Sequence, residues 1–136
     1  MALTIRPLKE TDYNNILVTW WKDWKWVAPE RDFLPHDGVG GLMVMDDDIP
    51  VCAGFTYTTN SKVAWVDWII SNKNYRKKPE RGNAIEWLIE ALTNICKSSG
   101  HKYVYALIKN KPLIEVYKSL GYTQADSYVT EMIKKL

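Results

Sequence analysis

The chain has few of the residues that build metal centres and covalent cross-links. Its 136 residues include only two cysteines and two histidines. Cys52 falls in an apolar run and Cys96 on the apolar side of a predicted helix, so we expect two buried thiols and no disulfide. His36 and His101 lie far apart, and no zinc-ligand spacing is present. We therefore predict no metal site.

Long apolar runs and a strong net charge are also missing. No segment approaches the length of a membrane-spanning helix, and residues 1–12 contain no apolar signal core, which favours a cytoplasmic protein without a membrane partner. The formal net charge is only +2. A module that binds nucleic acid through its overall charge is therefore disfavoured, and nucleic acid is expected at most as an acceptor substrate.

What the chain does contain is enough apolar sequence for one domain, which we place at residues 1–136. Apolar alternation, helical spacing and turn residues predict an α/β fold with a mixed sheet and helices on its faces. The predicted strands are 3–6, 41–45, 51–58, 63–71, 103–108 and 128–133. The predicted helices are about 11–25, with Thr11 or Asp12 as its cap, then 83–99 and 113–120.

The most informative stretch runs from residue 63 to 99. A β-branched and aromatic strand leads into a basic loop with Arg76, and then into an amphipathic helix that begins near Gly82. Free N–H groups in the first turn of a helix, the helix dipole and nearby cations together favour a bound phosphate. The strand, loop and helix therefore predict an anion site.

Two motifs resemble the GCN5-related N-acetyltransferase (GNAT) family. Residues 74–92, NYRKKPERGNAIEWLIEAL, are similar to its acyl-CoA pyrophosphate loop, Arg/Gln-x-x-Gly-x-Gly/Ala, with Gly82-Asn83-Ala84 at the end of the motif. Pro79 replaces the usual Arg or Gln, so either the loop is longer here or Lys78 or Arg81 takes the cationic role. Residues 108–122 resemble the family's Asn-x-x-Ala-x-x-x-Tyr-x-x-x-Gly-Phe signature. The matching positions are Asn110, Leu113, Tyr117, Gly121 and Tyr122.

The resemblance covers nearly the whole chain and implies the acyl-CoA N-acyltransferase fold. Its sheet is twisted and mostly antiparallel, the strands at 63–71 and 103–108 form a parallel, splayed pair, and helices cover both faces. The implied cofactor is acetyl-CoA, whose pantetheine arm would pair with the backbone of the first of these strands. The implied cofactor-binding residues are Ile69, Ile70, Ser71, Lys77, Lys78, Arg81, Gly82, Asn83, Ala84 and Asn110, the last of which is equally suited to cap a helix.

The resemblance also implies direct transfer of an acetyl group to a primary amine. Tyr117 would protonate the leaving thiolate, although its helical position also suits a buried aromatic residue. Asp67 stands in an otherwise apolar strand, where burial would raise its pKa towards that of a useful base. The alternatives for Asp67 are a solvent-facing position or a role in placing the substrate, with water accepting the proton.

For the unidentified amine acceptor, the aromatic and charged region after the first helix is the predicted binding site. The candidate residues are Trp20, Trp21, Asp23 and Trp24, because not every ring there can be buried and an aromatic wall suits a cation. Two other functions remain open: an inactive GNAT-fold protein that binds or inhibits a macromolecular partner, and a small nucleic-acid-binding module. A homodimer formed through the last strand is also possible.

Overall fold

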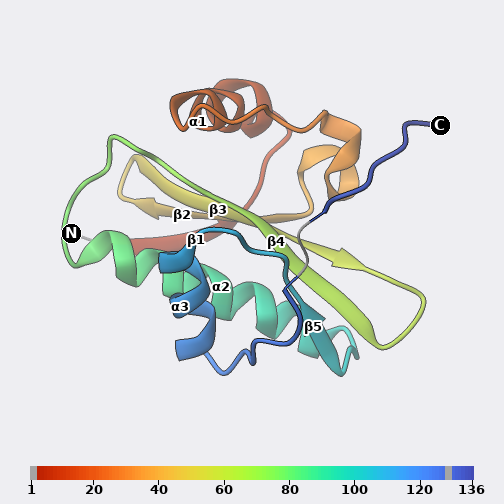
Figure 1. Ribbon diagram of the computed structural model, residues 1–136. Coiled ribbons are helices and arrows are strands. Elements are labelled where there is room, and N and C mark those ends of the chain that lie inside the picture. Colours follow the sequence, from red (N-terminus) through yellow and green to blue (C-terminus); the bar gives the residue numbers. More distant parts are fainter. Residues whose placement is uncertain (1–2, 128–129) are drawn as a thin grey trace.

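A computed structural model describes residues 3–127 and 130–136, and it contains one five-stranded sheet in the order β1-β2-β3-β4-β5 (Figure 1). The first four strands are antiparallel neighbours, and β5 is parallel to β4. The strands are β1 (Leu3–Pro7), β2 (Gly41–Asp46), β3 (Ile49–Thr58), β4 (Val63–Ser71) and β5 (Tyr103–Tyr105). This arrangement confirms the predicted mixed, mostly antiparallel sheet.

Helices cover both faces of the sheet, as predicted. Figure 1 shows α1 above it and α2 and α3 below it. The helices are α1 (Val18–Asp23), α2 (Glu80–Ser98) and α3 (Lys111–Ser119); a π-helical segment (Tyr13–Leu17) precedes α1, and two short 3₁₀ segments (Arg31–Phe33 and Pro35–Gly38) follow it. No helix in the described part of the chain is both long and apolar enough to span a bilayer.

Each face of the sheet has its own core, because the strand side chains alternate between the two faces. On the α2 face, Val44 and Val66 pack with Leu88 and Leu92, which are four residues apart on one side of the helix. The opposite core is built around Trp21. Cys52 and Cys96 are buried free thiols on the α2 face, as predicted.

The first helix differs from the prediction because Asp12 has another role. Its side chain makes no cap hydrogen bond to the helix. Both carboxylate oxygens instead accept hydrogen bonds from the Arg6 guanidinium, at 2.7 and 3.0 Å, and one also accepts from the Lys9 backbone N–H. The α-helical part ends at Asp23, two residues before the predicted end.

The last part of the sheet is also smaller than predicted. Strand β5 ends at Tyr105 instead of residue 108, because β4 and the chain after β5 separate there. Of the predicted last strand, Tyr128 and Val129 lie outside the described residues, and residues 130–133 form no strand. Helix α3 begins at Lys111, earlier than predicted, since the Asn110 side chain caps it by accepting the Leu113 N–H at 3.0 Å.

Candidate active site

The parallel pair β4–β5 opens after three residues. Val63, Ala64 and Trp65 pair with Tyr103–Tyr105, and the two segments then diverge. At the next residue of β4, the Val66 carbonyl accepts a hydrogen bond from the Tyr117 hydroxyl, at 2.9 Å. The splay predicted from the sequence is therefore present, and Tyr117 of α3 lies beside it.

A β-bulge follows at once on the other side of β4. Phe55 of β3 pairs with Asp67, whereas Ala53 pairs with Ile70, so one extra residue is inserted in β4. Trp68 has a φ of 57°, in the left-handed region that bulky residues rarely adopt. Packing holds this conformation, because the Trp68 ring meets the edges of Trp21 and Phe33 with ring centres about 6 Å apart. A strained backbone of this kind typically accompanies a functional site.

Asp67 bridges the splay. One carboxylate oxygen accepts the Trp68 N–H at 3.1 Å, and the other accepts the Leu107 N–H at 3.3 Å from the segment after β5. Burial raises the pKa of Asp67 from its usual 3.8 to about 6; the two hydrogen bonds act against this shift, and the charge of Glu131 adds to it. At neutral pH the group is thus a carboxylate that accepts a proton more readily than an ordinary aspartate.

Tyr117 is 2% exposed. Its ring meets the edge of Tyr122 with centres 4.9 Å apart, and the Tyr122 hydroxyl shares a hydrogen bond with Thr93 of α2. Burial raises the pKa of Tyr117, and the negative charge of Asp67 raises it further. Tyr117 is therefore a protonated hydroxyl at neutral pH, held rigidly at the backbone of β4.

At the other end of β4, the first turn of α2 offers a free donor. No side chain caps this helix, and the Gly82 N–H donates to no acceptor among the described residues. The fold does not require glycine here, since a Cβ at Gly82 would have no atom within 4 Å, whereas one at Gly41 would collide with the Gly54 backbone. Of the other predicted phosphate ligands, Asn83 donates its N–H to Pro79 and Ala84 is buried.

The predicted cations differ in how far they are already engaged. Lys77 lies 3.4 Å from buried Asp46, whose carboxylate also accepts the Tyr75 hydroxyl at 2.7 Å. Arg81 donates to the Ser71 hydroxyl at 3.1 Å. Lys78 is exposed and has no hydrogen bond or ion pair within the described residues.

The predicted acceptor residues do not surround Asp67. Trp20 and Trp21 are buried in the core, 5% and 1% exposed. The Trp24 indole donates to the Ser71 carbonyl at 2.8 Å, and its ring lies beneath the Arg81 guanidinium. The Asp23 carbonyl accepts from Lys73 close by. Trp24 and Asp23 therefore belong to the end of β4 that faces the predicted phosphate site.

Two aromatic residues near Asp67, one partly buried and one exposed, were not among the predicted site residues. Trp65 of β4 and Tyr105 of β5 stack with ring centres 4.8 Å apart and planes 17° from parallel. The sequence could have placed Trp65 beside Asp67, because residues two apart in a strand share a face. The high density of Trp after the first helix pointed to a different region.

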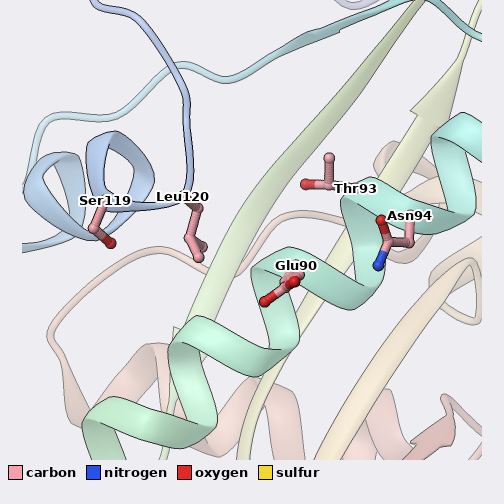
Figure 2. Close-up of a pocket in the computed structure, with 5 residues that line it drawn as sticks. All are labelled: Glu90, Thr93, Asn94, Ser119 and Leu120. Atoms are coloured by element: carbon pink, nitrogen blue, oxygen red, sulfur yellow. The ribbon is translucent and has the colours of Figure 1, made fainter.

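Two hollows on the surface lie away from Asp67 and Tyr117. A cavity of about 360 Å³ opens between α2 and α3, lined by the five residues labelled in Figure 2, Glu90, Thr93, Asn94, Ser119 and Leu120. A shallower hollow is lined by Glu30, Arg31, Asp32 and Asp37. At the splay, Asp67 accepts the Leu107 N–H and Tyr117 donates to the Val66 carbonyl. Within residues 3–127 and 130–136, no three metal-ligating side chains gather at one point.

No family model and no curated protein matches the sequence. Solved structures do. The chain is similar to the ribosomal-protein-S18-alanine N-acetyltransferase of Escherichia coli, with a TM-score of 0.70 and 18% identity over 92% of this chain and 80% of that one. The glucosamine-6-phosphate N-acetyltransferase of Arabidopsis thaliana has a TM-score of 0.70 and 12% identity, over 98% of this chain and 100% of that one. An aminoglycoside N-acetyltransferase in complex with CoA has a TM-score of 0.67 and 13% identity, over 98% of this chain and 96% of that one. These similarities confirm the N-acetyltransferase fold that the sequence motifs implied.

Proposed function

We propose that residues 1–136 form one catalytic domain, an acetyl-CoA-dependent N-acetyltransferase that transfers the acetyl group directly to a primary amine. The observation that carries this proposal is the placement of three groups along one strand. The free Gly82 N–H lies beyond the end of β4, and Asp67 and Tyr117 lie at its splay. The three solved structures described above are N-acetyltransferases, and one of the three is in complex with CoA.

The residues beyond the end of β4 suit the pyrophosphate of acetyl-CoA. Gly82 offers an unused donor at a helix N-terminus and has no side chain to hold an anion away from it. Within the described residues Lys78 has no hydrogen bond or ion pair, whereas Lys77 and Arg81 nearby have partners in Asp46 and Ser71. The pantetheine arm would run along Ile69, Ile70 and Ser71, and Asn110 would contact it with the amide nitrogen that its capping role leaves unused. Acetyl-CoA supplies the activated acyl group.

In the proposed reaction, Asp67 accepts the proton that the amine loses as its nitrogen bonds to the acetyl carbon. The backbone of the β4 bulge polarises the carbonyl. Tyr117 donates its proton to the sulfur as the carbon–sulfur bond breaks, so the products are an amide and free CoA. In the proposed reaction, the hydrogen bonds from Tyr117 to Val66 and from Leu107 to Asp67 would exchange partners when the substrates bind.

The test is calorimetric titration of acetyl-CoA into the wild type and Gly82→Glu, followed by detection of free thiol with a panel of amines. We expect micromolar-range binding, about −8 kcal/mol, that the substitution abolishes. The Gly82→Glu side chain enters open space, so the folded state is expected to persist. Wild-type protein that binds no acetyl-CoA would overturn the proposal. Binding without thiol release from any amine would show a protein that retains the cofactor but does not turn it over.

A further inference from the structure

Two aromatic rings stack beside Asp67 at the β4–β5 edge of the sheet. We call the stacked pair Trp65 and Tyr105 the aromatic platform. Tyr105 is 48% exposed, and Trp65 is not part of the core beneath α1. Figure 1 shows α1 above the sheet and away from β5. Trp65 is partly buried and Tyr105 is half-exposed, so the stack presents aromatic surface beside Asp67.

The platform is joined to Asp67 through both of its strands. Trp65 and Asp67 are two residues apart on the same face of β4, which corresponds to about 7 Å along the strand. Two residues after Tyr105, the Leu107 N–H donates to the Asp67 carboxylate. The distance between the platform and the carboxylate is therefore fixed by the backbone.

The local charge differs between the splay at Asp67 and the aromatic platform, and so does the chemical group that each can bind. Asp67 and the neighbouring Glu131 make the splay negative. No Lys or Arg lies over the platform in the described part of the chain, although Tyr13 and Trp24 each have a cation over the ring. The charge of an acceptor amine would be held by Asp67, where the reaction requires it. The rings then remain for the uncharged part of the same molecule, and a flat aromatic group gains most from stacking.

We propose that the acceptor is a primary amine whose short carbon chain carries an aromatic ring, with the ring on the platform and the amino group at Asp67. This proposal rests on the acetyltransferase function above and adds the substrate class. It assigns Trp65 and Tyr105 as specificity-determining residues, and it moves acceptor recognition away from Trp20 and Trp21.

The test compares 2-phenylethylamine with 2-cyclohexylethylamine, which has the same carbon skeleton without the aromatic ring. Binding is measured by calorimetry in the presence of CoA, so that no turnover is needed. We expect the aromatic amine to bind about tenfold more tightly. Trp65→Leu and Tyr105→Leu should each remove that preference. Tyr103→Leu is the matched control, since Tyr103 is a more exposed tyrosine at the start of β5, next to Val63.

Equal binding of the two amines by the wild type would overturn the proposal, as would tighter binding of spermidine or of a lysine peptide. An aromatic preference that survives both platform substitutions would also overturn it. Thermal unfolding checks that Trp65→Leu folds, and Tyr105→Leu at the exposed edge keeps the test decisive if it does not. Titration of acetyl-CoA into the same samples separates the two ideas. Loss of acetyl-CoA binding with a retained aromatic preference overturns the proposed transferase alone, and the reverse result overturns the platform alone.

Discussion

The hydroxyl of Tyr117 in α3 donates a hydrogen bond to the carbonyl of Val66 in β4, at 2.9 Å. This contact joins residues 51 positions apart at the point where β4 and β5 stop pairing. Tyr117 thus satisfies a backbone acceptor in the free protein. In the proposed reaction, it would become available to the leaving thiolate once another donor, such as an amide of the pantetheine arm, took its place at Val66.

Tyr117→Phe should lower kcat by about 100-fold and change the KM for acetyl-CoA little, because it removes a proton donor needed only as the carbon–sulfur bond breaks. Stability should fall by about 1 kcal/mol through the lost hydrogen bond to Val66. Steady-state kinetics and urea unfolding measure the two effects. An acetyl thioester with a more acidic leaving thiol provides the control, since it should restore most of the rate. If the rate fell equally with acetyl-CoA and with the more reactive thioester, Tyr117 would have a structural role only.

Asp67→Asn should abolish the acid limb of the rate profile. In the wild type, kcat/KM should rise through about pH 6 as Asp67 ionises, and the variant should show a low, flat profile in that range. Glu131→Gln is the companion variant. It removes a negative charge that raises the pKa of Asp67, so the limb should move to lower pH while the maximal rate is retained. A limb that stays at the same pH in Asp67→Asn would show that another group is the base.

The same carboxylate should destabilise the folded protein at neutral pH. The pKa of Asp67 is higher in the folded state than its usual 3.8, so its contribution to stability is fully present below pH 4 and is lost as the pH rises through about 6. Asp67→Asn should therefore gain stability relative to the wild type between pH 4 and pH 7, by on the order of 2 kcal/mol, on top of a pH-independent loss from the one N–H that its amide nitrogen cannot accept. Denaturant unfolding at the two pH values tests the sign. Equal differences at both would contradict it.

Gly82→Ala should separate the requirement of the fold from that of the ligand. A Cβ at this position meets nothing, and alanine is a better helix former than glycine, so the variant should gain roughly 0.5–1 kcal/mol of stability. Its affinity for acetyl-CoA should nevertheless fall, because the methyl group stands next to the free N–H. Thermal unfolding and calorimetry on the same sample measure both. A gain in stability with unchanged affinity would mean that the anion does not approach this N–H.

The parts of this fold that could be predicted are those determined by local signals. Strand β4 and helix α2 have alternating and helical apolar spacing, so their positions follow from the sequence. The positive φ of Trp68 could not be predicted, because tertiary packing against Trp21 and Phe33 holds it. The length of β5 likewise depends on where β4 diverges from it, which no property of residues 103–108 reveals.

In the candidate site, too, local sequence features predict some residues, whereas others depend on the whole fold. Asp67 and Tyr117 could be selected because a lone carboxylate in an apolar strand and a spaced Asn–Tyr–Gly motif are sequence features. The acceptor side could not, because which rings are exposed depends on the whole fold. Trp20 and Trp21 have helical spacing that fits either a pocket wall or a core, and they are core. Trp65 is partly buried and stacks on Tyr105, a tertiary pairing that no local pattern of either strand reveals.

Lys78→Gln should weaken acetyl-CoA binding more than Lys77→Gln does. This result would identify Lys78 as the cation that takes the role of the usual Arg or Gln, which Pro79 replaces in this sequence. Lys77 faces Asp46, and Arg81 is held by the Ser71 hydroxyl, so each would give up a partner to reach a phosphate. Lys78 is exposed and has no such partner within the described residues, and its full charge is available. We expect a several-fold loss for Lys78→Gln that shrinks as salt is added, because the contact is electrostatic and exposed. Calorimetry at two ionic strengths measures it. A larger loss for Arg81→Gln would instead assign the cationic role to the first turn of α2, and would mean that acetyl-CoA draws Arg81 away from Ser71 and the Trp24 ring.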